Sequence, residues 1–253
     1  MAEALGKTAT SETIAVVSGA GSGIGRAVAL GLARARSLVV AADIDLDAAR
    51  ETAAERPSMI AAYHVDVSDA MSVEALRDKV TSELGVARIL VNCAGWERTE
   101  HFLNTTAAFA ERVVAINYLG PVHMCRAFLG GMVEGGSGGK VVNIASDAGR
   151  VGTSGETVYA GAKGGVIALT KSLAHEMARY RINVNAVCPG PTDTALFRAQ
   201  APGLQEALIR AVPFGRLARP QEIADAVLFF ASDAASFITG QVLSVSGGLT
   251  MVG

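Results

Sequence analysis

The sequence has 253 residues, of which 50% are apolar and 28 are glycine, and its formal net charge is −2 at pH 7. This length suits one sizeable α/β domain, and the near-neutral charge without a Lys/Arg-rich run argues against nucleic-acid binding. The first twelve residues lack the apolar core of a signal peptide, and no apolar stretch reaches membrane-spanning length. We therefore expect a cytoplasmic protein without a membrane partner.

Apolar runs alternate with segments of helical periodicity along the chain. This alternation predicts a parallel sheet with helices on both faces, joined by right-handed crossovers. We expect a three-layer αβα Rossmann fold, with a doubly wound seven-stranded parallel sheet, in which residues 1–253 form a single domain. Strands are predicted near 14–18, 38–42, 59–65, 88–92, 139–145, 182–187 and 241–245, and helices near 23–35, 46–55, 70–84, 106–130, 156–179, 204–211 and 220–231.

A glycine-rich turn follows the first predicted strand and opens an Ala/Leu-rich helix. Gly19, Gly23 and Gly25 stand where the backbone can approach a pyrophosphate, and the helix start offers N–H groups. Asp43 follows the second strand, 18 residues after Gly25, which is the context of a dinucleotide site. A carboxylate there favours NAD over NADP because it repels a 2′-phosphate. A turn-capping role for Asp43, with Asp45 or Asp47 capping the next helix, is compatible with this one.

Tyr159 and Lys163 lie four residues apart in V-Y-A-G-A-K-G-G, and Ser146 lies thirteen residues before Tyr159. Positions i and i+4 share one face of a helix, so the phenol and the ammonium would point into the same pocket. A neighbouring cation favours the phenolate. The alternative is an ordinary amphipathic helix with a packed Tyr and a solvated Lys, and this spacing alone does not decide between them.

These two signals together resemble the short-chain dehydrogenase/reductase family, over essentially the whole chain. The resemblance also includes Asp66-Val67, the strand end N-C-A-G at 92–95, Asn117, N-I-A-S ending at Ser146, and C-P-G-P-T-D-T around Gly190. Two departures are small. Ser18 stands where the family usually has Thr, and Cys93 where it usually has Asn; neither belongs to the catalytic set.

The resemblance implies a role for each catalytic residue. Tyr159 would exchange the proton at the substrate oxygen, while Lys163 lowers its pKa and contacts the cofactor ribose. Ser146 would polarise the substrate oxygen, and Asn117 would hold a relay water. Because a mid-helix Asn is unusual, we expect a local break there. The cofactor-binding residues implied are Gly19, Ser22, Gly23, Ile24, Gly25, Asp43, Asp66, Val67, Asn92, Ala94, Gly95, Lys163, Pro189, Gly190, Thr192 and Thr194. Ordinary turns are the alternative for Asp66, 92–95 and 189–194.

Substrate residues are harder to predict. Besides Ser146 and Tyr159, we expect Trp96 and Phe197 in the pocket, and Pro and Gly around the segment 193–215 suit a mobile lid. Within the family, three stretches are most similar to 2-hydroxycyclohexanecarboxyl-CoA dehydrogenases. That similarity implies NAD-linked oxidation of a β-hydroxyacyl thioester, with Leu196 in the apolar wall. The CoA phosphates would then meet Arg98, Arg150 or Arg198, each of which could equally be a solvated surface charge.

The remaining expectations concern metals, assembly and other activities. The four His and three Cys residues show no ligand spacing, so we expect no metal. Glycines in the 156–179 helix and the apolar final segment resemble the interfaces of family homotetramers. Two alternatives stay open: an NADPH-dependent 3-oxoacyl-thioester reductase, which Asp43 argues against, and a non-catalytic dinucleotide-binding regulator, which would usually lack Tyr159 or Lys163.

Overall fold

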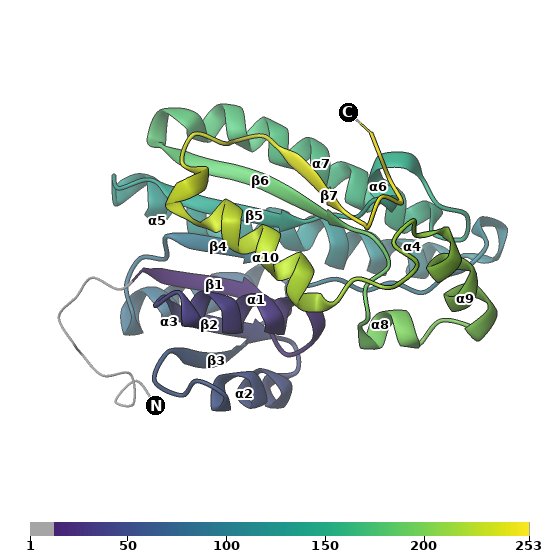
Figure 1. Ribbon diagram of the computed structural model, residues 1–253. Coiled ribbons are helices and arrows are strands. Elements are labelled where there is room, and N and C mark those ends of the chain that lie inside the picture. The colour runs from purple at the N-terminus through teal and green to yellow at the C-terminus, as the bar shows by residue number, and fades with distance from the viewer. Residues whose placement is uncertain (1–12, 253) are drawn as a thin grey trace.

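The computed structural model describes residues 13–252, and seven parallel strands form a single sheet at its centre (Figure 1). The strands are β1 (Ile14–Ser18), β2 (Leu38–Asp43), β3 (Ile60–His64), β4 (Ile89–Asn92), β5 (Gly139–Ile144), β6 (Ile182–Pro189) and β7 (Val242–Val245). Their order is β3-β2-β1-β4-β5-β6-β7. The order reverses between β1 and β4, and ligands bind beyond the carboxyl ends of strands at such a switch point. The predicted fold class is confirmed.

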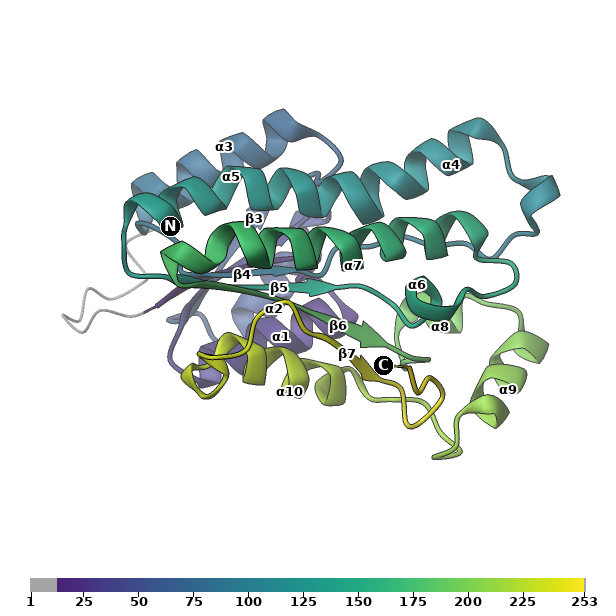
Figure 2. The same cartoon turned by 90° about the horizontal axis from the view of Figure 1, so that it is seen from above.

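Helices cover both faces of this sheet. The long ones are α1 (Gly23–Arg34), α2 (Leu46–Ala54), α3 (Ala70–Glu83), α4 (Ala107–Val114), α5 (Gly120–Glu134), α7 (Thr157–Met177), α9 (Pro202–Ala211) and α10 (Pro220–Ala231). Shorter segments are α6 (Ala148–Val151), α8 (Ala195–Arg198), η2 (Phe102–Asn104), η3 (Ala115–Leu119), η4 (Ala178–Tyr180) and η5 (Asp233–Ala235). Figure 2 shows α3, α5 and α7 on one face, and α1, α2 and α10 on the other.

Neighbouring residues of one strand pack into two different cores. Val16 of β1 and Val40 of β2 belong to the core under α3, α5 and α7, whereas Val17 and Val39 pack with α1 and α10. All five residues of β1 are buried. Burial on both faces explains why the strands are continuous apolar runs without alternating polar positions.

The predicted helix over 106–130 is interrupted at its middle. The segment η3 is a π-helical turn between α4 and α5, and Asn117 within it is fully buried. Its amide nitrogen donates to the carbonyls of Trp96 (2.6 Å) and Val113 (3.0 Å), and its oxygen accepts from the Trp96 N–H (3.2 Å). The expected local break is confirmed, and π-turns of this kind occur frequently at functional sites.

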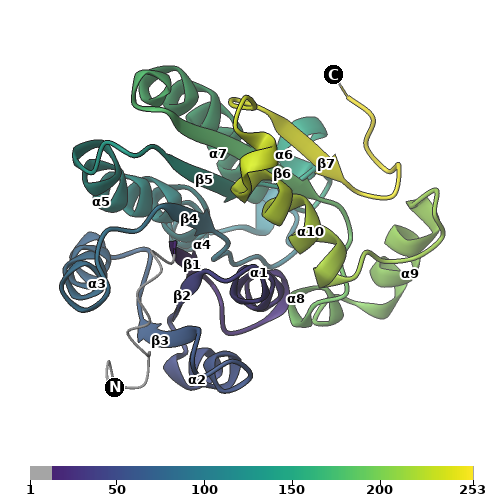
Figure 3. The same ribbon diagram turned by 60° about the vertical axis from the view of Figure 1, so that its left-hand side comes forward.

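The other predicted elements are present, with ends shifted by at most two residues. The four-residue helices α6 and α8 are too short for hydrophobic periodicity to reveal, and the sequence did not predict them. They lie beyond the carboxyl ends of the strands, where Figure 3 shows α8 and α9 projecting from the body of the fold. None of the helices within residues 13–252 combines the length and apolar character that crossing a membrane requires.

Candidate active site

A pocket of 680 Å³ opens at the carboxyl ends of the central strands. Its walls come from the loops that follow β1 to β7, from α4 and η3, and from the α8–α9 segment. Every predicted cofactor residue except Asn92 lines it, and so do the predicted substrate residues Ser146, Tyr159, Trp96 and Phe197. The fold therefore gathers into one cavity residues that lie far apart in the sequence.

The glycine loop forms a backbone cradle at one end of the pocket. Gly19 has φ +70°, and a Cβ there would lie 2.7 Å from the Ala94 Cα. A Cβ on Gly25 would lie 2.0 Å from the carbonyl oxygen of Gly19, which excludes any side chain. Ser22 precedes α1 without capping it through its side chain, so the first N–H groups of the helix have no side-chain cap. A diphosphate fits such a helix start, and the residues present therefore fit a dinucleotide.

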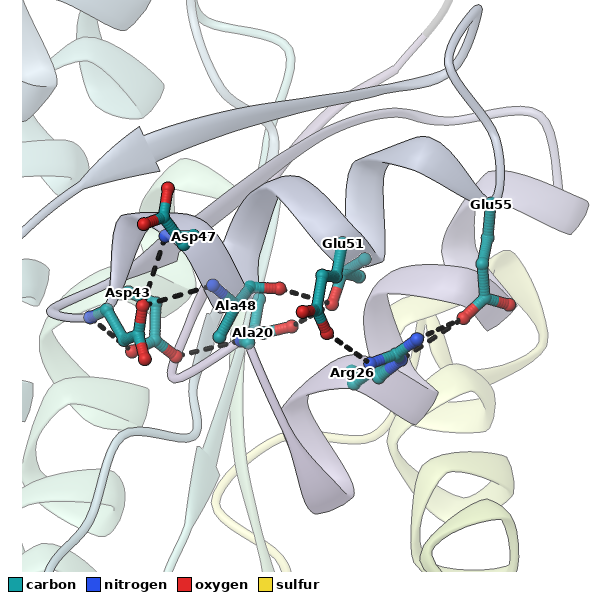
Figure 4. A network of polar contacts seen from close by, with 10 residues as sticks. Ala20, Arg26, Asp43, Asp47, Ala48, Glu51 and Glu55 are labelled. Carbon is teal, nitrogen blue, oxygen red and sulfur yellow. Dashed lines mark hydrogen bonds and ion pairs between the residues drawn. The ribbon is translucent and has the colours of Figure 1, made fainter.

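Asp43 lies beside the glycine loop (Figure 4). Its Oδ2 accepts the Gly21 N–H at 2.8 Å, and its Oδ1 accepts the Asp45 N–H at 3.0 Å. Asp45 in turn caps α2 by accepting the N–H groups of Asp47 and Ala48, both at 3.1 Å. The turn-capping alternative for Asp43 is thus present, and the same carboxylate also lines the pocket.

Two further contacts hold α2 against this loop. The buried hydroxyl of Thr52 donates to the Ala20 carbonyl at 2.9 Å. Figure 4 also shows Arg26 of α1 reaching α2, with ion pairs to Glu55 (2.7 Å) and Glu51 (3.8 Å). Exposed ion pairs of this kind contribute little, about 0–1 kcal/mol. We therefore assign the positioning of the loop mainly to Thr52 and Asp43.

Ser146, Tyr159 and Lys163 converge at the other end of the pocket. Ser146 follows β5 and accepts the Ala148 N–H at 3.1 Å, and it lines the pocket together with Tyr159. Lys163 is only 3% exposed, and its Nζ donates to the Ile144 carbonyl at 2.9 Å. That Nζ lies 5.6 Å from the centre of the Tyr159 ring. The predicted shared face of the helix is confirmed.

The pKa of Tyr159 differs from the expectation. Burial raises the pKa of Tyr159 above its ordinary value, the charges of Glu97 and Glu156 raise it further, and the hydrogen bond from Ser146 acts in the opposite direction. Burial also lowers the pKa of Lys163 to about 8. We expected Lys163 to lower the pKa of the phenol. Here the pKa is raised, because desolvation and two nearby carboxyls dominate while the ammonium is bonded to a backbone carbonyl.

Two predicted asparagines lie outside the pocket wall. The Asn92 side chain points into the core, where its Nδ2 donates to Asn143 Oδ1 at 2.7 Å, and Asn143 donates to Thr170 at 2.9 Å. The β4 strand turns this side chain inward and leaves Ala94 and Gly95 at the surface of the cavity. Asn117 lies behind the wall and fixes the backbone of Trp96.

The substrate end is lined by aromatic side chains. Trp96 packs edge-on against Phe109 with ring centroids 5.7 Å apart, and Arg112 stacks 4.1 Å from the Trp96 ring centre. Phe197, on α8, is 6% exposed and faces the same cavity. Thr194 caps α8 by accepting the Phe197 N–H at 3.3 Å, so the cap and the apolar anchor belong to one turn.

None of the three arginines considered for CoA phosphates lines the pocket. Arg98 stacks on Phe109, and Arg198 pairs with Asp193. The Arg150 guanidinium donates to Ser244 and to the carbonyls of 242 and 252, which ties it to β7 and the chain end. The arginine that does line the pocket is Arg112, which the sequence did not single out.

Sequence reasoning also missed two acids, Glu97 and Glu156, that line the pocket beside Tyr159. A signal was available, since Glu97 stands two residues after Gly95 and Glu156 three residues before Tyr159. Both segments were expected at the ligand, but neither residue belongs to the motifs of the resemblance.

Cysteine and metal chemistry find no support in this site. Cys93, Cys125 and Cys188 are free thiols, and burial raises the pKa of each to about 12. A thiol with such a pKa is a poor nucleophile near neutral pH. Within residues 13–252, no three His, Cys, Asp or Glu side chains are grouped so as to hold a metal ion.

A glycine cradle at a sheet switch point, with a Ser–Tyr–Lys group beside it, is typical of dinucleotide-dependent oxidoreductases. Comparisons with known proteins agree. The family described as enoyl-(acyl carrier protein) reductase matches residues 19–250. The (3R)-3-hydroxyacyl-CoA dehydrogenase of Canis lupus familiaris is 37% identical over 249 residues, which is 94% of this chain and 96% of that protein. The cis-4-hydroxycyclohexanecarboxylate dehydrogenase of Sinomonas cyclohexanicum is 39% identical over 250 residues, covering 96% and 99%.

The chain belongs to the short-chain dehydrogenase/reductase family, and it is an oxidoreductase that interconverts a secondary alcohol and a ketone. A crystal structure named ribose-5-phosphate isomerase, from Brucella melitensis 16M, is also similar, with a TM-score of 0.88 and 38% identity over 95% of this chain and 93% of that one. That name denotes another reaction. The hydroxyl-bearing Ser–Tyr pair of this pocket supports alcohol oxidation and ketone reduction instead.

Proposed function

We propose that this protein uses NAD(H) to interconvert a β-hydroxyacyl thioester and the corresponding β-keto thioester. The observation that carries the proposal is the single pocket that joins Asp43 at one end to Ser146, Tyr159 and Lys163 at the other. The hydroxyacyl-CoA dehydrogenase among the relatives supports the substrate class.

The residues divide the chemistry as follows. A bound nicotinamide dinucleotide supplies the hydride acceptor for oxidation, or the donor for reduction. Ser146 donates a hydrogen bond to the substrate oxygen, and Tyr159 takes the proton from that oxygen in oxidation and returns it in reduction. Lys163 lies beside the phenol and contacts the cofactor ribose, and Asn117 acts from behind the wall by holding the backbone of Trp96.

The preference for NAD rests on the charges of the pocket. The cationic residues in its wall are Lys163 and Arg112, both at the substrate end, while the residue after Asp43 is Ile44. A 2′-phosphate beside Asp43 would therefore meet a carboxylate and no compensating cation from the wall. This arrangement disfavours the alternative of an NADPH-dependent reductase.

The segment 193–215 would act as the substrate lid. Its two helices carry Leu196, Phe197 and Leu208 into the pocket wall. Gln205 of α9 donates to the Gln200 carbonyl at 2.7 Å, which joins α9 to the turn after α8. The helices α8 and α9 can therefore close over a ligand as one unit, with hinges at the Pro and Gly residues that flank them.

The thioester assignment predicts a large contribution of CoA to the specificity constant. We expect kcat/KM for 3-hydroxybutyryl-CoA to exceed that for methyl 3-hydroxybutyrate and for cyclohexanol by at least about tenfold, or 1.4 kcal/mol. Steady-state rates of NADH formation at 340 nm measure this. A preference for CoA below about threefold would remove the thioester claim and leave the dehydrogenase assignment standing.

Assembly into a homotetramer is a separate expectation. Gly161 on α7 has open space around it, and Phe237, just before β7, is fully exposed, as is most of Met251. These positions suit the two interfaces of a tetramer with 222 symmetry. Light scattering should give close to four chains, and Phe237→Asp should give smaller particles. A monomer at micromolar concentration would contradict the expectation.

A further inference from the structure

Two glutamates face each other in the pocket wall beside Tyr159. Glu97 lies on the loop after β4, Glu156 directly precedes α7, and both line the pocket. Both also line a small cavity behind this wall, together with Tyr159, so the two acids and the phenol lie close together. Two carboxylates this close repel each other, which favours a proton on one of them.

The surroundings keep that proton in place near neutral pH. Burial, followed by the charge of Glu97, raises the pKa of Glu156 to about 8. Burial also raises the pKa of Glu97, but the hydrogen bonds from Glu156 and Thr99 and the charge of Lys163 act in the opposite direction. The Thr99 hydroxyl donates to Glu97 at 3.5 Å. Glu156 therefore holds its proton near pH 7, and the charge that helps to raise its pKa lies on Glu97.

This charge has no direct salt-bridge partner, although the nearby Lys163 ammonium acts on Glu97 through its charge. Among residues 13–252, neither glutamate forms a salt bridge with a Lys or Arg side chain. Lys163 is bonded to the Ile144 carbonyl, and Arg112 is stacked on Trp96. The other ionisable groups around the pair and Tyr159 are Arg98 and Glu100 in a small cavity behind them, and the neutral thiol of Cys188.

We propose that the Glu97–Glu156 pair imposes a charge requirement on the substrate: the group next to the reacting carbinol must be neutral. The proposal rests on the proposed function, in which Tyr159 meets the substrate oxygen. The carboxylate of a free β-hydroxy acid lies two bonds from the reacting carbon, so it would enter a partly dry pocket beside a like charge. An ester or thioester at that position carries no charge.

This requirement narrows the substrate class. Of the two relatives described above, one is named for a CoA thioester and the other for a free carboxylate. The acid pair therefore favours a β-hydroxyacyl thioester over a free β-hydroxy acid. The acid pair selects against a free acid through its charge, and this selection requires no arginine at the CoA phosphates.

The test compares an ester with its own acid, so that CoA plays no part. In the wild type at pH 7, we expect kcat/KM for methyl 3-hydroxybutyrate to exceed that for 3-hydroxybutyrate by at least about 30-fold. The double variant Glu97→Gln/Glu156→Gln removes the whole charge, and the ester-to-acid ratio should fall at least about fivefold. Glu111→Gln is the matched control, because Glu111 is an exposed acid on α4 outside the pocket, and it should keep the wild-type ratio.

The single variant Glu156→Gln separates the effect of the charge on Glu97 from the effect of the ionisation of Glu156. In Glu156→Gln, the new side-chain amide would donate to the Glu97 carboxylate as the protonated acid does, so the ratio at pH 7 should stay as in the wild type. Between pH 7 and 9 the wild-type ratio should rise further, because Glu156 ionises as the pH passes about 8. The ratio of Glu156→Gln should rise less than that of the wild type, because the loss of charge on Lys163 near the same pH is common to both proteins. Effects of Tyr159 and the cofactor on pH dependence cancel, since both substrates use them.

Unfolding gives a readout that does not depend on activity. A carboxyl whose pKa is higher in the folded chain stabilises the fold below its unfolded pKa, and this contribution is lost as the pH rises through the folded value. For Glu156 the window runs from the ordinary value of 4.5 to about 8. The free energy of unfolding should therefore decline more steeply across pH 5–8 in the wild type than in Glu156→Gln. Equal slopes would show that no proton is held.

The outcomes distinguish the inference from the proposed function. If CoA adds nothing over the methyl ester while the ester-to-acid ratios behave as described, the thioester function fails and the charge requirement stands. If the wild-type ratio is below about threefold, or the double variant keeps the wild-type ratio, the charge requirement is overturned whatever CoA does.

Discussion

Tyr159→Phe should lower kcat at least about 100-fold, because it removes the group that exchanges the proton with the substrate oxygen. The ring of Tyr159 packs in a closed site and phenylalanine preserves that ring, so the fold and NADH affinity should remain. Steady-state NADH formation gives the rate, and NADH fluorescence titration gives the dissociation constant.

Tyr180→Phe provides the control for this substitution. Tyr180 lies in η4, outside the pocket, and its hydroxyl bonds Arg179, so the same chemical change there should leave kcat close to the wild-type value. If Tyr159→Phe retains more than about a tenth of the wild-type turnover, Tyr159 is not the proton carrier.

Asp43→Asn should weaken the discrimination between the two dinucleotides. In the wild type we expect kcat/KM with NAD⁺ to exceed that with NADP⁺ at least about tenfold, or 1.4 kcal/mol, because the carboxylate repels a 2′-phosphate. Asparagine keeps one of the two acceptors that bind the N–H groups of Gly21 and Asp45 and removes the charge. Asparagine therefore separates the loss of charge repulsion from the loss of the hydrogen bonds that hold the loop, whereas alanine would remove both.

Asp45→Asn is the matched control, since Asp45 caps α2 and does not line the pocket. This variant loses the same charge two residues away, and its NAD⁺/NADP⁺ ratio should stay close to that of the wild type. Equal kcat/KM for the two cofactors in the wild-type protein would refute the role assigned to Asp43.

Most of the fold could be predicted from the sequence, because local sequence patterns specify its strands, helices and glycine loop. Strands buried on both faces are continuous apolar runs, and the glycine loop needs backbone geometry that only glycine permits, as the close contact at Gly25 shows. The break at Asn117 could also be predicted, because an amide buried among apolar neighbours must find partners outside the regular helix.

The parts that escaped prediction depend on which way a side chain points and on what faces it. Asn92 ends β4 beside pocket residues, yet its side chain turns into the core. Glu97 and Glu156 are far apart in the sequence, and only the folded chain brings them into one wall, where burial and then their charges raise the pKa of Tyr159. Arg112 reaches the pocket by stacking on Trp96, a contact that no spacing rule indicates.

The central claim is that this chain oxidises a secondary alcohol with NAD⁺ at Tyr159. The most direct measurement incubates the purified protein with 3-hydroxybutyryl-CoA and NAD⁺ and determines NADH and 3-oxobutyryl-CoA together, by absorbance and mass spectrometry. The account predicts that both products form in equal amounts with the wild type and barely at all with Tyr159→Phe. Absence of NADH formation with this substrate, its methyl ester and simple secondary alcohols alike would contradict it.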